Sequence, residues 1–232
     1  MNADESRQHM RAHLLASADV KLRMADDNLN DVFAGVKVIV SAFQTGGKLM
    51  LCGNGGSAAD SQHIAAEFTN RLRPDLQRAA LPALALTTDT SFLTSHANDF
   101  CFENVFQRQI EALGRPGDVL VAISSSGNSE NVIRAARACR ARGITTIGLL
   151  GRRGGHLGSL VDVPIIVPSD NTQHVQETHI ALGHIIAELV ERALFERPLT
   201  TSKLKAVDAR EPLHEAEPDG SGGRPLSTSF RD

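Results

Sequence analysis

Residues 49–57, LMLCGNGGS, pass from four apolar residues straight into a glycine-rich loop that precedes a helix-forming segment. A continuous apolar run of this kind is typical of a strand buried on both faces of a parallel sheet. A second stretch repeats the arrangement, because residues 119–123 (VLVAI) run into residues 124–129 (SSSGNS). We therefore expect two strand-loop-helix units whose loops meet at one edge of a sheet, where α/β folds bind ligands.

Further apolar runs extend this pattern on both sides. Three more strands are predicted, at residues 84–87, 144–149 and 163–167. Helical segments lie between the strands, at residues 58–70, 104–113 and 131–142, with a short piece near Leu157 and a long helix at residues 173–195. The alternation predicts an α/β three-layer sandwich of the flavodoxin-like kind, with a five-stranded parallel sheet and a long C-terminal helix.

The chain divides into three parts by composition. Residues 1–46 predict two helices, at about 5–25 and 29–43, and the second is too apolar for a free surface helix. We expect this pair to pack on the core and on neighbouring subunits. Residues 47–197 form the main domain, and residues 198–232, rich in glycine, proline and charge, predict a flexible tail.

Composition excludes several classes of function. The 232 residues carry a net charge of −3 and only 4% aromatic residues, which argues against nucleic-acid binding. No apolar run approaches the roughly 18 residues that span a membrane, and the N-terminus lacks the order of a signal peptide. Three unclustered cysteines do not suggest a disulfide framework. We expect a cytoplasmic protein.

The two loops suit a phosphorylated small molecule. Helix N-termini offer unpaired N–H groups to anions, and glycine and serine let a phosphate approach and bind. Residues 53–58 also satisfy the relaxed dinucleotide pattern, but the acidic residue expected about 20 positions later is missing. A Walker loop is excluded because no Gly-Lys-Ser/Thr occurs.

Acid-base and metal-binding residues lie on two predicted helices. His63 and Glu67 are four residues apart and share a helix face. Gln176 and His184 are eight apart, about 80° around the helix and about 12 Å along it, so they hardly reach one metal ion. If both serve metal sites, these are two symmetry-related sites, or one ligand comes from a neighbour. The spacing predicts an active site at a subunit interface.

Taken together, these motifs resemble the phosphoheptose isomerase (sedoheptulose 7-phosphate isomerase) branch of the sugar-isomerase (SIS) fold. The resemblance covers residues 5–196 and rests on Asp60 and the pattern Gln176-Glu177-x-His179-x₄-His184 as well as on the two loops. It implies conversion of sedoheptulose 7-phosphate to D-glycero-D-manno-heptose 7-phosphate through an enediol. That reaction is the first step toward nucleotide-activated heptose for lipopolysaccharide and other glycans.

The resemblance also implies roles for particular residues. Glu67 and His184 would be the catalytic acid-base pair. The implied zinc ligands, one ion per subunit of a homotetramer, are His63, Glu67, Gln176 and His184. The implied substrate contacts are Asn54, Gly55, Gly56, Ser57, Glu67, Asn98, Asp99, Ser124, Ser125, Ser126, Ser129 and Gln176. One departure is Gln173, where some relatives carry an acidic residue.

Two alternatives stay open at this point. The initiator-associating regulator that binds bacterial DnaA resembles the same family and is not an enzyme. In that branch, the residues corresponding to Glu67 and His184 are replaced, whereas both are present in this chain. A second alternative is an isomerase of another sugar phosphate.

Overall fold

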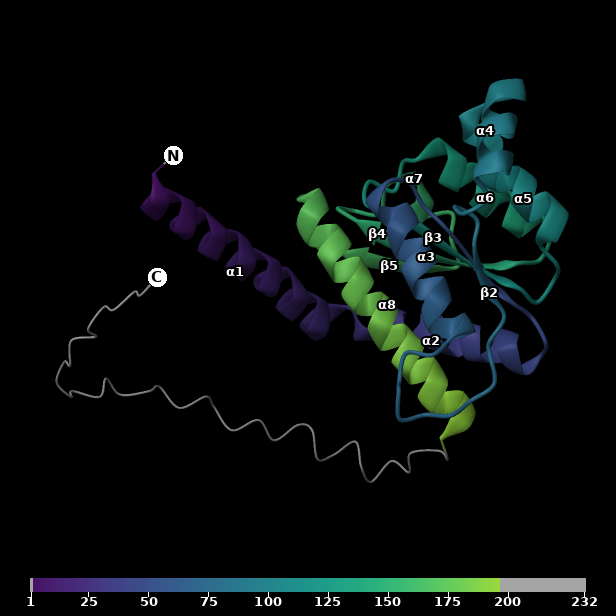
Figure 1. The fold of residues 1–232 in the computed structure, drawn as a ribbon, viewed down its shortest axis with the longest axis horizontal. Helices are drawn as coiled ribbons and strands as arrows, with labels where there is room; N and C mark the ends of the chain where they lie inside the picture. The colour runs from purple at the N-terminus through teal and green to yellow at the C-terminus, as the bar shows by residue number, and fades with distance from the viewer. Residues whose placement is uncertain (1, 197–232) are drawn as a thin grey trace, which may run out of the picture. The chain divides into compact units, whose positions relative to one another are not determined.

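The computed structural model describes residues 2–196, which form one compact unit around a five-stranded parallel sheet (Figure 1). The strands lie in the order β2-β1-β3-β4-β5, which confirms the predicted flavodoxin-like arrangement. Their bounds are β1 Leu49–Cys52, β2 Ala83–Ala85, β3 Val119–Ser124, β4 Thr145–Gly151 and β5 Val163–Val167. Because β1 has β2 on one side and β3 on the other, the order reverses direction between β1 and β3.

Helices cover both faces of the sheet, and this explains why the central strands are apolar throughout. Alternate residues of a strand point to opposite faces. Leu49 and Leu51 of β1 therefore enter one core with α1, α2, α3 and α8, whereas Met50 and Cys52 enter the other with α5, α6 and α7. The helix bounds are α1 Ala3–Asp27, α2 Leu29–Gln44, α3 Gly56–Thr69, α4 Thr90–Asp99, α5 Val105–Leu113, α6 Glu130–Ala141, α7 Gly155–Gly158 and α8 Thr172–Phe195.

One helix and one 3-10 turn were not predicted from the sequence. The Asp89 carboxylate accepts a hydrogen bond from the Phe92 N–H at 2.9 Å and caps α4. The short 3-10 helix Phe102–Asn104 follows. Because α4 has few buried side chains, its sequence carries little apolar periodicity. The predicted second strand, 84–87, is one to two residues out of place, at the sheet edge.

The N-terminal helices join the main core. Val20 and Met24 of α1 and Val36 and Ile39 of α2 are buried in the same cluster as the sheet residues. Among residues 2–196, no helix is long and apolar enough to cross a membrane. The predicted tail, 198–232, lies outside the described residues.

Candidate active site

The two loops singled out in the sequence lie at the point where the strand order reverses. The first follows β1 and the second follows β3, its neighbour in the sheet. The side-chain amides of Asn54 and Asn131 join them, each donating to the oxygen of the other, at 2.9 and 2.8 Å. Both loops also precede helices, α3 and α6, so two helix N-termini approach one place.

The serine loop is held in shape by its own hydroxyls and by the turn before α7. Ser124 Oγ lies 3.1 Å from Ser129 Oγ and accepts the Gly127 N–H at 3.1 Å. Gly127 has a φ of +66°, and a Cβ there would lie 1.9 Å from the Gly154 carbonyl oxygen, so only glycine fits. On the other side, Asn128 Oδ1 accepts the His156 N–H at 3.0 Å.

The predicted loop contacts differ in how far they reach solvent. Ser57 and Ser124 are buried, and Ser124 bonds within its own loop. By contrast, Gly55 and Gly56 are exposed. The more accessible polar residues are Asn54, Ser125, Ser126 and Ser129, all half-buried. The surface that can meet a ligand therefore consists of backbone and these half-buried side chains.

Helices α3 and α8 bring together three of the predicted functional side chains. His63 Nε2 lies 3.1 Å from Glu67 Oε1 and 3.1 Å from His184 Nε2. The side chain of His63 is 48% exposed and that of Glu67 is 18% exposed. One ligand atom from each of the three residues lies within 4.8 Å of the others. These three side chains, called the His-Glu-His cluster below, join two helices that are far apart in sequence.

The geometry of the cluster fits a zinc ion. Two nitrogen ligands of a tetrahedral zinc, each about 2.1 Å from the ion, lie about 3.4 Å apart. The two facing imidazole nitrogens, at 3.1 Å, are close to that separation. Two histidines and one carboxylate also form a donor set that catalytic zinc sites use, with a further position left open.

Gln176 lies beside the first loop, and Asp60 lies near His63 of the cluster. The side-chain amide of Gln176 packs against Gly56, where an added Cβ would lie 2.6 Å from Nε2. Gln176 thus places α8 against the first loop, while His184, eight residues later, meets His63. Asp60 lies one turn before His63, and its Oδ2 is buried with no hydrogen-bond partner. Burial raises the pKa of Asp60, and nearby His63 partly opposes that rise.

Asn98 and Asp99 stand apart from these groups. Both are exposed at the end of α4, and Asn98 Nδ2 donates to Asp99 Oδ1 at 2.9 Å. Their implied contact with substrate stays a prediction.

The remaining histidines and cysteines are mostly structural. His179 is fully buried, its Nε2 lies 3.1 Å from the Leu150 carbonyl oxygen, and burial lowers its pKa to about 4. The Nε2 of His13 lies 3.3 Å from Glu177 Oε1, because α1 packs on α8. Burial raises the pKa of the Cys139 thiol to about 12 and that of Cys52 still further, so both thiols stay protonated near neutral pH.

Sequence reasoning missed three residues that support the site: Asn131, Arg78 and Glu191. Asn131 holds Asn54. Arg78 and Glu191 form an ion pair with no exposed side-chain surface. One signal for Glu191 is present in the sequence, because it follows His184 by seven residues and therefore shares its helix face. Arg78 lies in an irregular segment between α3 and β2, where spacing carries no such signal.

Comparisons with known proteins agree on one family. The model of the SIS domain matches residues 14–151. The phosphoheptose isomerase of Clostridium acetobutylicum is 49% identical over 188 residues, which are 80% of this chain and 95% of that protein. The one from a Roseiflexus species is 54% identical over 181 residues, 78% of this chain and 91% of the relative.

A solved structure supports the same conclusion. The phosphoheptose isomerase of Neisseria gonorrhoeae matches with a TM-score of 0.75 and 40% identity, covering 80% of this chain and 98% of that one. The match therefore extends over nearly the whole of that relative as well as over most of the fold described above. The chain belongs to the phosphoheptose isomerase family of SIS-domain proteins.

Proposed function

We propose that this protein is an aldose-ketose isomerase that converts sedoheptulose 7-phosphate to D-glycero-D-manno-heptose 7-phosphate. The observation that carries the proposal is the meeting of Glu67 and His184 at His63, on a helix that begins at the first glycine loop. The named relatives, about half identical over most of their length, support the choice of substrate. The product would feed the synthesis of nucleotide-activated heptose.

The two loops would bind and orient the sugar phosphate. Hydroxyls of Ser125, Ser126 and Ser129 and the N–H groups at the start of α3 and α6 supply donors for an anion. Asn54, with Asn131, fixes the distance between the loops. Such contacts lie away from the reacting carbons, and their binding energy holds C1 and C2 beside the cluster.

Proton transfer would fall to Glu67 and His184. Interconversion of a ketose and an aldose moves one proton between C1 and C2 and another between their oxygens. The Glu67 carboxylate would remove the carbon-bound proton, which gives an enediol, and would return it to the neighbouring carbon. His184 would carry the second proton between the oxygens, since histidine gains and loses a proton near neutral pH.

A zinc ion fits the same cluster, and we propose one per subunit. His63, Glu67 and His184 would hold it through one donor atom each. Gln176 would be the fourth residue of the set, supplied by a neighbouring subunit, because one helix places Gln176 and His184 about 12 Å apart along its axis. When bound, zinc supplies positive charge that stabilises the negative oxygen of the enediolate. The protein's part is to keep the three donors on rigid helices.

We further propose a homotetramer with active sites between subunits. Apolar side chains are exposed along α1 and α8, among them Leu14, Leu22, Ile185 and Leu189. A small apolar hollow of about 140 Å³ lies between the same helices. These surfaces would be covered by other subunits, and sedimentation equilibrium of the full chain tests the assembly.

The activity is tested by incubating the purified protein with sedoheptulose 7-phosphate and measuring formation of the aldose. We expect turnover that falls at least about tenfold after metal removal by a chelator and returns with zinc. Binding of the sugar phosphate without any turnover, with or without zinc, would overturn the isomerase proposal. Full activity of metal-free protein would overturn only the metal proposal.

A further inference from the structure

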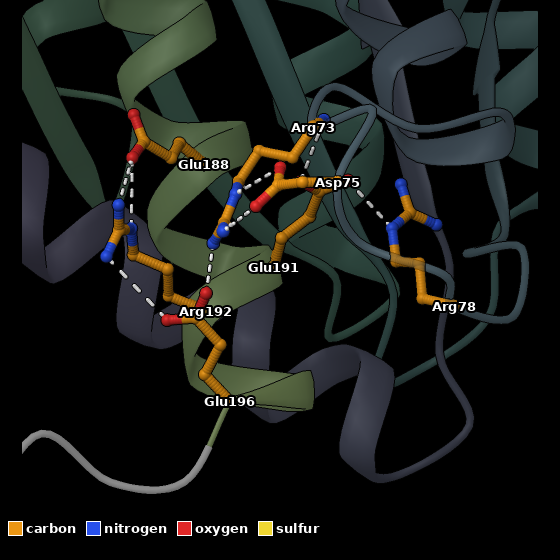
Figure 2. Close-up of polar contacts among 7 residues, drawn as sticks. All are labelled: Arg73, Asp75, Arg78, Glu188, Glu191, Arg192 and Glu196. Carbon is orange, nitrogen blue, oxygen red and sulfur yellow. Dashed lines mark hydrogen bonds and ion pairs between the residues drawn. The ribbon is translucent and has the colours of Figure 1, made fainter.

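A second polar cluster joins α3 and α8, and nothing in the reaction uses it directly. Arg78 and Glu191 form an ion pair, with Arg78 Nε 2.7 Å from Glu191 Oε1, and both side chains are fully buried (Figure 2). Burying two charges costs several kcal/mol unless further hydrogen bonds satisfy them. A pair in this position therefore needs a reason beyond its own attraction.

Arg78 also bonds to the end of α3, besides a bond from its Nη1 to the Ala79 carbonyl oxygen at 2.9 Å. Its Nη2 donates to the Glu67 carbonyl oxygen at 2.8 Å, and its Nη1 donates to the Phe68 carbonyl oxygen at 2.9 Å. Both carbonyls belong to the last turn of α3, where helix carbonyls lack partners and a cation is favoured. Arg78 thus caps the C-terminus of α3 by donating to the backbone carbonyl of Glu67, the proposed base.

Glu191 connects Arg78 to α8. Its carboxylate also accepts the N–H groups of Leu72 and Arg73, at 3.1 and 3.3 Å. Seven residues separate Glu191 from His184, which places both on one face of α8, about 10 Å apart along its axis. The same face of one helix therefore presents His184 to the His-Glu-His cluster and Glu191 to the end of α3.

We propose that Arg78 and Glu191 are positioning residues that set the register of α3 against α8, and so the placement of Glu67 relative to His184. We call the pair the buried clamp. It touches neither the substrate nor the cluster's side chains, and it acts through the Glu67 backbone. Close packing reinforces it, because a Cβ at Gly183 would lie 2.6 Å from Ile64 Cδ1, so the helices already touch beside His63 and His184.

This inference rests on the isomerase activity proposed above and is tested with the full-length protein. Arg78→Lys keeps the charge but loses the planar fork that reaches two carbonyls and a carboxylate together. Glu191→Gln is the second variant, in case the first does not fold. Arg192→Gln is the matched control, because Arg192 belongs to the neighbouring ion pairs with Glu188 and Glu196 and bonds to neither α3 nor Glu191 (Figure 2).

For folded Arg78→Lys or Glu191→Gln we expect kcat about tenfold lower, KM within twofold and a zinc dissociation constant about tenfold higher. The control should match wild type in all three. A clamp that is only structural would lower the thermal midpoint and leave kcat and zinc affinity within twofold of wild type, which would overturn the inference.

Failure of the proposed function has a different signature. A wild type that binds zinc without turnover contradicts the isomerase proposal, and the zinc dissociation constants of the variants then decide the inference alone. A wild type with neither turnover nor zinc binding leaves the clamp no site to position, and overturns the inference too.

Discussion

Helices α3 and α8 carry two polar clusters of opposite character. In the His-Glu-His cluster, the His63 side chain is 48% exposed. The cluster is joined by two contacts, from His63 Nε2 to Glu67 Oε1 and from His63 Nε2 to His184 Nε2. In the buried clamp, Arg78 and Glu191 have no exposed side-chain surface, and together they bond to five backbone groups and to each other. Both clusters bridge the same pair of helices.

The difference separates groups that are placed to react with a ligand from groups that fix the positions of other residues. A half-exposed set of side chains can exchange its contacts for a metal ion or a substrate at little cost. A buried pair that is hydrogen-bonded within the protein cannot exchange its contacts in this way, because losing one partner leaves an uncompensated charge in the interior. We therefore expect changes in the accessible cluster to reduce catalysis with little loss of stability.

The largest expected effect is that of Glu67→Gln. The amide keeps the size of the side chain but cannot accept a carbon-bound proton, so we expect kcat to fall at least about a thousandfold, or about 4 kcal/mol in activation free energy. The measurement is steady-state turnover of sedoheptulose 7-phosphate.

Thermal unfolding is the control for that variant. Because the Glu67 carboxylate bonds to the His63 imidazole, a contact that an amide can also make, the midpoint should stay within a few degrees of wild type. A large fall in the midpoint, or kcat within tenfold of wild type, would contradict the view that the His-Glu-His cluster serves catalysis while the buried clamp serves structure.

A buried histidine sharpens the same contrast on α8. His179 lies five residues before His184, and its pKa of about 4 is below the ordinary value of 6.5. Between pH 6.5 and 4 the unfolded chain binds a proton at this site and the folded chain does not. The free energy of unfolding therefore falls as pH drops through this window, by about 3 kcal/mol in all at about 1.4 kcal/mol per pH unit.

The variant His179→Met removes this titration. It leaves the Leu150 carbonyl without its donor, which costs about 1 kcal/mol at pH 7. Between pH 7 and 4.5 the variant should lose about 2 to 3 kcal/mol less stability than wild type, as measured by urea unfolding at several pH values. Parallel pH profiles for the two proteins would show that His179 does not titrate this way.

The sequence predicted the sheet and the His-Glu-His cluster better than it predicted the buried clamp. Apolar runs such as residues 119–123 revealed the sheet because buried parallel strands have no polar alternation. Spacing on one helix revealed His63 with Glu67. Neither signal exists for Arg78, which lies in an irregular segment and meets Glu191 across 113 positions. Helix α4 escaped prediction for a related reason, since only His96 of its ten residues is buried.

The smallest expected effect is that of Gly56→Ala, at the N-terminal end of α3. An added methyl at Gly56 would lie 2.6 Å from Gln176 Nε2, and the amide, at the end of a flexible side chain, can swing away. Gly56 is the first residue of α3, so alanine there also favours the helix slightly. We expect Gly56→Ala to leave the thermal midpoint unchanged or slightly raised.

Its effect on catalysis should still be measurable. Displacing Gln176 removes an implied substrate contact and one residue of the proposed metal set, so we expect kcat/KM to fall about tenfold, or about 1.4 kcal/mol. The matched control is Gly158→Ala, because Gly158 is no implied substrate contact and an added Cβ there would lie no closer than 3.8 Å to any neighbour. If both variants lost activity equally, a cause other than displacement of the Gln176 amide would explain the loss. A loss confined to Gly56→Ala would place the Gln176 amide in the working site, on the accessible side of the helix pair.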